Sequence, residues 1–139
     1  MQIDLVNETS FEVNINKLEN ILKNLTEQEI ELLVLNNSQI QEINHEFRQI
    51  NKPTDVLSFP YESMPGAPLG SIAISIDFVE EKSKEYAHSL EDEFLLLFIH
   101  GLLHLLGFDH EVDSGEHRQK EEELIKKYNL PNSLIVRNS

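Results

Sequence analysis

The stretch His100-Gly-Leu-Leu-His104-Leu-Leu-Gly107-Phe-Asp109-His110 decides how this chain folds and what it can bind. His100 and His104 are four residues apart, so an α-helix places both imidazoles on one face, about one turn apart. Two imidazoles in that arrangement can bind one metal ion. Gly107 follows within a turn of His104, and a glycine there lets the backbone adopt the left-handed conformation that ends a helix. The chain can then turn back and carry His110 toward the first two rings.

The residues around the histidine pair are apolar on nearly every side, which predicts a buried helix. A lone histidine in such a run is usually a hydrogen-bonded core residue. Here two lie at helical spacing and a third follows the glycine, and burying imidazoles without partners is costly. Three neutral imidazoles suit Zn²⁺ and leave a fourth position open. Since the chain has no cysteine, we expect one zinc ion held by His100, His104 and His110.

The ligand spacing also matches the pattern HExxHxxGxxH of the metzincin metalloproteases. In that pattern a glutamate follows the first histidine and acts as the general base. This chain has Gly101 at that position, and its methionines, Met1 and Met64, both precede His100, so the methionine turn of metzincins is missing. Peptide hydrolysis is therefore the lesser alternative for a site of this geometry.

A second motif combines with the first to give a specific resemblance. Asn44-His-Glu-Phe-Arg48, followed by Lys52-Pro-Thr-Asp-Val-Leu-Ser58-Phe-Pro60, precedes the histidine motif in the chain. The two motifs together resemble the YbeY family of bacterial endoribonucleases, over roughly residues 34–110. One departure is Gly70-Ser71-Ile72 in place of the family's Gly-Asp-Ile, so no role of that aspartate carries over.

The resemblance implies a zinc-dependent endoribonuclease that cuts single-stranded RNA. Its implied roles are maturation of the 3′ end of 16S ribosomal RNA and ribosome quality control, with ribosomal RNA and the ribosome or ribosomal proteins as partners. A non-catalytic ribosome- or RNA-associated factor with a structural zinc stays open as the alternative. The absence of cysteine is compatible with the cytoplasm, where we expect the protein, and no signal peptide or membrane span is predicted.

Three residues of the second motif are candidates for acting on RNA. Arg48 is the candidate catalytic residue, because a guanidinium can stabilise the charge on a transferring phosphoryl group through two parallel hydrogen bonds. It is equally compatible with a solvated cation near a helix end. Lys52 and Ser58 are candidates for contacting the RNA backbone, although a solvated lysine and a strand-ending serine fit the sequence as well.

The remaining polar residues near the histidine motif have less specific interpretations. Asp109 is expected to orient a ligand imidazole or to shape the turn after Gly107, ahead of a third role as proton acceptor. His45, His88 and His117 lack ligand spacing, and we expect them at the surface.

Length and composition predict one globular domain over residues 1–139, with 40% hydrophobic residues. The formal net charge of −14 disfavours general binding to nucleic acid, because phosphate contacts need a basic surface. A bound dication, with Arg48 and Lys52 near the second motif, would still allow a locally positive cleft.

The hydrophobic periodicity predicts an α+β fold. We expect one small mixed β-sheet with helices packed on it and a buried central helix that carries the metal motif. Helices are expected to begin at the capping residues Ser38, Asp77, Ser89 and Ser114. The expected strands cover residues 2–6, 29–35, 56–59 and 71–76, and the expected helices cover residues 14–25, 38–47, 77–87, 89 to about 106, and 114–128.

Overall fold

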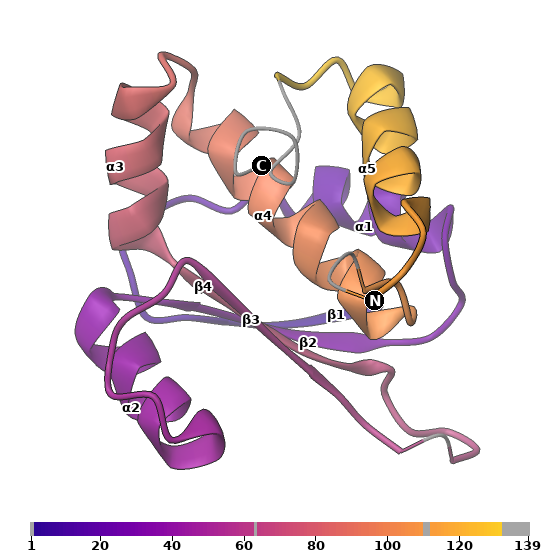
Figure 1. The fold of residues 1–139 in the computed structure, drawn as a ribbon, viewed down its shortest axis with the longest axis horizontal. Helices are drawn as coiled ribbons and strands as arrows, with labels where there is room; N and C mark the ends of the chain where they lie inside the picture. Colours follow the sequence, from indigo (N-terminus) through magenta and orange to yellow (C-terminus); the bar gives the residue numbers. More distant parts are fainter. Residues whose placement is uncertain (1, 63, 110–111, 132–139) are drawn as a thin grey trace.

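A computed structural model describes residues 2–62, 64–109 and 112–131. Its elements confirm the predicted α+β fold (Figure 1). Within the described ranges the elements are, in chain order, β1 (Ile3–Asn7), α1 (Ile15–Lys23), β2 (Ile30–Leu35), α2 (Asn37–Arg48), β3 (Val56–Pro60), β4 (Gly70–Ser75), α3 (Ile76–Glu85), α4 (Leu90–Leu105) and α5 (Glu116–Lys127).

The four strands form one mixed sheet in the order β1-β2-β4-β3. β1, β2 and β4 run parallel, while β3 pairs antiparallel with β4, with Ser58 opposite Ile72. β4 therefore lies between two strands that precede it in sequence, and β3 forms one edge of the sheet. Successive residues of β4 face opposite sides, so Ile72 and Ile74 join the main core while Ala73 joins a smaller one.

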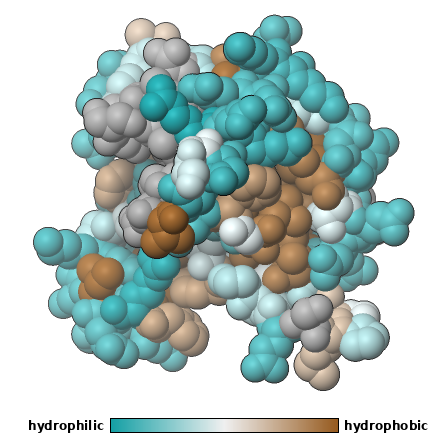
Figure 2. Space-filling view, turned by 45° about the vertical axis from the view of Figure 1, so that its right-hand side comes forward, coloured by the Kyte–Doolittle hydropathy of each residue, from teal (hydrophilic) through white to brown (hydrophobic). Residues whose placement is uncertain are grey.

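The sheet separates two layers of helices. Helices α1, α3, α4 and α5 lie on one face and α2 lies on the other (Figure 1). The main core fills the first side, and a smaller cluster of Leu35, Ile40, Leu57 and Ala73 fills the space under α2. The face shown in Figure 2 is mostly hydrophilic around a central hydrophobic area.

Helix α4 is the buried central helix that the sequence predicts. Every residue from Phe94 to Ile99 is at most 2% exposed. The helix begins as expected, since the Ser89 side chain accepts a hydrogen bond from the N–H of Asp92 at 3.0 Å. It also ends as expected, because Gly107 has a φ of +100° and its N–H donates to the carbonyl of His104. None of the helices in the described ranges has the length and apolar character needed to span a bilayer.

The predicted start of α2 at Ser38 is wrong. The N-cap is Asn36, whose side chain accepts from the N–H of Gln39 at 2.9 Å. In return the Gln39 side chain accepts from the N–H of Asn36 at 3.0 Å. This reciprocal pair satisfies two backbone donors at once, so it prevails over the single cap that Ser38 would provide.

Two further predicted caps are also wrong. Helix α3 begins after Ser75, and the Asp77 carboxylate instead accepts from the N–H of Asn37 at 2.7 Å, joining α3 to α2. Helix α5 begins after Gly115 and not after the expected Ser114. The cap position has a φ of +105°, a left-handed conformation that glycine adopts more easily than serine.

Candidate metal centre

Helix α4 presents His100 and His104 together, as the four-residue spacing predicts. Their ring centroids are 5.0 Å apart. His100 is 9% exposed, whereas His104 is partly exposed. One ring therefore sits in the helix interface and the other reaches toward solvent, which suits a site that a ligand can enter.

Helix α5 brings a third imidazole to this pair. The centroid of the His117 ring lies 4.8 Å from those of both His100 and His104. His117 is fully buried, so its expected place at the surface is wrong. The reason is that His117, Glu121 and Leu124 share the inward stripe of α5, at helical spacing.

The three imidazoles form a group that can hold a metal ion. Each offers one ring nitrogen, and these nitrogens lie within 4.8 Å of one another. Zinc bonds imidazole nitrogen at about 2.0–2.1 Å, so a small rotation of the side chains would close the group on one ion. The donor set is neutral nitrogen without thiolate, which fits zinc among the common metals of proteins.

Glu121 orients the first of these rings. Its Oε2 lies 2.9 Å from His100 Nδ1 and 3.6 Å from His117 Nε2, and the residue is 1% exposed. An ionised carboxylate only accepts hydrogen bonds, so this contact favours the tautomer of His100 with its hydrogen on Nδ1. In the neutral imidazole the lone pair then lies on Nε2, the nitrogen left for a metal.

The loop before α5 is held by two aspartates. The Asp113 carboxylate accepts from the N–H groups of Gly115 and His117, both at 2.9 Å. The Asp109 carbonyl accepts from the N–H groups of Val112, at 3.2 Å, and Asp113, at 2.9 Å. These two bonds use the backbone carbonyl of Asp109, so both roles of its side chain, shaping the turn and orienting an imidazole, stay predictions. Sequence reasoning missed both Asp113 and Glu121.

Gly101 is required where α4 crosses the sheet. A Cβ at this position would meet Ser58 Oγ at 3.0 Å and side-chain methyl groups of Ile72 and Val56 at 3.1 and 3.2 Å. The Ser58 hydroxyl also donates to the Gly101 carbonyl at 3.0 Å. A side chain at this position would therefore be crowded by three neighbours, each of which would have to shift by a few tenths of an ångström.

The predicted RNA-contacting residues lie around the edge strand β3. Ser58 faces α4, and its hydroxyl hydrogen already bonds to Gly101. Lys52 is exposed in the loop before β3, and Arg48 is the exposed last residue of α2, on the other side of the sheet. Ser71 is 6% exposed, and since Ile72 faces the main core, the alternation of β4 directs Ser71 toward the α2 side.

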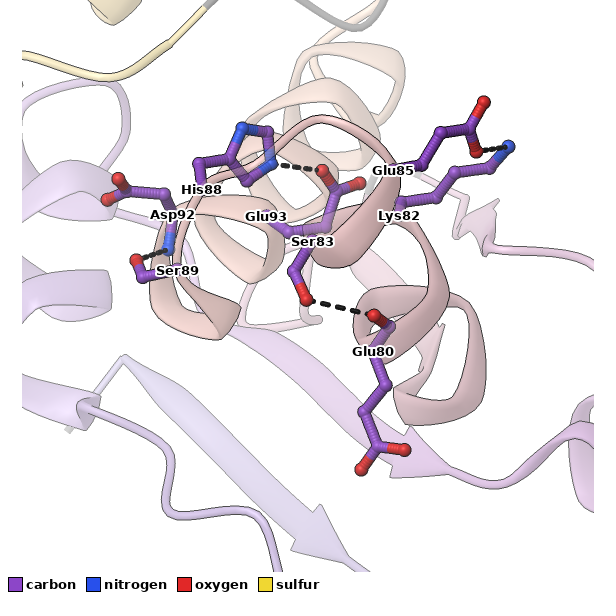
Figure 3. Close-up of polar contacts among 8 residues, drawn as sticks. All are labelled: Glu80, Lys82, Ser83, Glu85, His88, Ser89, Asp92 and Glu93. Carbon is purple, nitrogen blue, oxygen red and sulfur yellow. Dashed lines mark hydrogen bonds and ion pairs between the residues drawn. The ribbon is translucent and has the colours of Figure 1, made fainter.

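The other histidines have different surroundings. His110 lies outside the described residues, so its place as a ligand stays a prediction. His45 is exposed, as expected. The His88 side chain is only 10% exposed and bonds through Nε2 to Glu93 Oε1 at 2.7 Å, so its expected place at the surface is wrong (Figure 3). That pair lies at the start of α4, between α3 and α4.

Comparison with known proteins agrees with this geometry. Residues 3–129 match the family model described as Endoribonuclease YbeY. The proteins named Endoribonuclease YbeY of Aliarcobacter butzleri and Sulfurimonas denitrificans are 64% and 60% identical, covering 99% and 97% of each chain. The solution structure of a Thermotoga maritima protein is similar with a TM-score of 0.62 and 27% identity, over 91% of both chains.

Proposed function

We propose that this chain, which belongs to the YbeY family, is a zinc-dependent endoribonuclease specific for single-stranded RNA. We infer that it acts as a single domain in the cytoplasm. Its proposed roles are maturation of ribosomal RNA, including the 3′ end of 16S RNA, and ribosome quality control with the ribosome or ribosomal proteins as partners. The relatives' names supply the reaction class, hydrolysis of RNA.

The observation that carries this proposal is the convergence of imidazoles from two helices beside one buried carboxylate. His100, His104 and His117 offer nitrogen ligands within 4.8 Å of one another, and Glu121 fixes the His100 ring at 2.9 Å. We propose His100 and His104 as ligands, with His110 as the third and the fourth position left open. His117 offers a nitrogen to the same group but is not a ligand in this proposal.

The work on RNA is proposed to be divided between the imidazole cluster and the residues of the second motif, of which Arg48 lies at the end of α2, on the other face of the sheet. A bound dication would supply Lewis acidity toward a phosphoryl oxygen. Arg48 would bind the transferring phosphoryl group through paired N–H donors, and Lys52 would contact a neighbouring phosphate. Ser58 is a weaker candidate for such a contact, because a phosphate needs a donor and the hydroxyl hydrogen is already given to Gly101.

The glycine at position 101, where metalloproteases of this ligand spacing carry a glutamate, argues against peptide hydrolysis. An amine leaving group needs a proton delivered to it, and the glutamate that does this in metalloproteases has no counterpart on α4. Phosphodiester cleavage expels an alkoxide instead, and its main demand is stabilisation of charge on the phosphoryl group.

One observation favours the alternative of a non-catalytic factor with structural zinc. His117 is fully buried beside His100 and His104. If His110 and His117 bound the same ion together, four imidazoles would fill a tetrahedral site, and structural zinc sites are closed in this way.

The deciding experiment incubates the zinc-loaded protein with a structured RNA that bears a single-stranded tail. Casein serves as the peptide substrate, and His100→Ala is the matched inactive variant. We expect cleavage within the tail by the wild type alone. Equal cleavage by the variant would indicate a contaminating nuclease, and cleavage of casein without RNA would favour the protease. No cleavage of either substrate, with ribosomes supplied, would favour the structural factor.

A further inference from the structure

The last turn of α2 presents an aromatic ring to solvent beside a cation. Phe47 is 64% exposed, and Arg48, the next residue, is exposed as well. The Phe47 ring centroid lies 5.7 Å from that of Phe59 in β3, at an interplanar angle of 58°. The ring is thus supported along one side by the sheet, while most of its surface remains accessible to a ligand.

The chain after α2 is tied back to the helix, so this surface has a fixed shape. Gln49 takes the left-handed conformation, with a φ of +57°. The Asn44 side-chain nitrogen donates to the Lys52 carbonyl at 2.9 Å, and the Gln41 side-chain nitrogen donates to Asn51 Oδ1 at 3.0 Å. The backbone of Lys52, a second exposed cation, is therefore held close to the last turns of α2.

The chain segment of this surface is locally cationic, although the protein as a whole is acidic. Residues 47–53 contain two cations and no acidic residue, in a chain of net charge −14. Among the described residues, no ion pair neutralises Arg48 or Lys52. The flanking acids are Glu46 and Asp55, and the Asp55 carboxylate accepts from the N–H of Val56 at 2.7 Å. An exposed ring followed in the chain by two cations without a described ion pair fits a polyanion that has flat apolar faces.

We propose that Phe47 stacks on a base of single-stranded RNA while Arg48 and Lys52 contact the adjoining phosphates. This inference rests on the proposed function and adds a substrate subsite to it. A base inside a duplex is already stacked on its neighbours, so a single exposed ring selects unpaired strands. Stacking is also tolerant of sequence, which predicts a preference for strand state over base identity.

The edge strand β3 connects this surface to the histidine cluster. Phe59 supports Phe47 on the α2 side of the sheet. The neighbouring residue Ser58 faces the opposite side and bonds to the carbonyl of Gly101, the residue after His100. An RNA strand that crosses the edge at β3 would thus have a base on Phe47 and a phosphate close to the helix that carries the imidazoles.

The test measures binding of a fluorescein-labelled, single-stranded 2′-O-methyl oligoadenylate by anisotropy, with the metal-loaded protein. The variants are Phe47→Ala, Phe47→Leu and Phe47→Trp, and Leu90→Ala is the control, because Leu90 is an exposed apolar residue, 39% exposed, at the start of α4. We expect the Ala and Leu variants to bind about 5- to 100-fold more weakly. The Trp variant and the control should bind as the wild type does.

The outcomes separate this inference from the proposed function. A wild type that binds no single-stranded RNA would count against the proposed function itself. A wild type that binds while Phe47→Leu binds as tightly as Phe47→Trp would overturn stacking by Phe47 and leave the proposed function intact. Equal affinity of the wild type for the duplex form of the same strand would also overturn it. Melting temperature and zinc content identify any variant that fails to fold. If Phe47→Ala fails to fold, the comparison of Phe47→Leu with Phe47→Trp decides whether Phe47 stacks on a base.

Discussion

Helix α4 has a buried carboxylate–imidazole pair at each end, and the two pairs have different surroundings. Near its start, His88 bonds to Glu93 at 2.7 Å, and Glu93 is fully buried (Figure 3). Near its end, His100 bonds to Glu121 at 2.9 Å, and Glu121 is 1% exposed. Burial and distance are nearly the same, so neither quantity alone identifies a functional site.

The difference lies in what the second ring nitrogen can reach. The His88 ring stacks on Tyr86, with centroids 6.2 Å apart, where α3 meets α4. The His100 ring lies about 5 Å from two further imidazoles, one on its own helix and one on α5. The comparison teaches that convergence of several imidazoles from separate elements marks a candidate metal site, whereas the His88–Glu93 pair ties the loop after α3 to the start of α4.

The largest expected effect comes from removing one imidazole at each end of α4. His104→Ala should lose the metal almost completely, with affinity falling by more than about 100-fold, beyond the range of changes that act through a ligand's neighbours. His88→Ala should keep the metal and lose only stability. Elemental analysis of both purified variants checks this. Equal metal content in His104→Ala and His88→Ala would remove the distinction between the two ends.

Arg48 belongs to neither carboxylate–imidazole pair. Its substitution therefore tests whether RNA cleavage depends on a residue outside the imidazole cluster. Arg48→Ala should cleave RNA about 100-fold more slowly or worse, because a charge contact made in the transition state is lost. Metal content and melting temperature should stay at the wild-type values, since Arg48 is exposed at the end of α2. Cleavage at a near-normal rate by the folded, metal-loaded variant would reject the role.

Removal of the metal should destabilise the protein through the cluster end of α4. At a zinc concentration about 100 times the dissociation constant, binding to the folded state alone adds about 2.7 kcal/mol. For a domain of this size the melting temperature should fall by roughly 5–10 °C on chelation and recover with zinc. An unchanged melting curve after verified removal of the metal would show that the fold is independent of the metal. The control is His88→Ala, which keeps the metal and should show the same fall in melting temperature on chelation as the wild type.

The parts of this site that depend on local spacing are predictable from sequence. His100 and His104 follow from the helical period, and the turn at Gly107 follows from the conformation that glycine permits. The sheet order was not predictable, because β4 inserts between β2 and β3 through pairing that no local pattern encodes. The α+β class could still be predicted without the strand order, because it depends only on which helices and strands are present.

The residues that the sequence did not reveal are polar ones buried by contacts between helices. His117 and Glu121 precede Leu124 on one stripe of α5, yet polar residues at such positions usually face water. The imidazoles of α4 opposite them help to make their burial favourable, and the contact between His100 and Glu121 joins residues far apart in the chain. The three caps at Asn36, Ser75 and Gly115 were missed for a simpler reason, since neighbouring residues compete for the same helix start.

The most direct test compares Glu121→Gln with Glu93→Gln, two matched changes of a buried carboxylate to an amide beside an imidazole. Titration with cobalt as a spectroscopic substitute for zinc gives the metal affinity of each full-length variant. We predict that Glu121→Gln binds the metal 10- to 100-fold more weakly, roughly the loss seen when the partner of a ligating histidine is changed. Glu93→Gln should keep the wild-type affinity while losing about 1–3 kcal/mol of folding stability. Equal metal affinities in the two variants would contradict the claim that Glu121 orients a metal ligand.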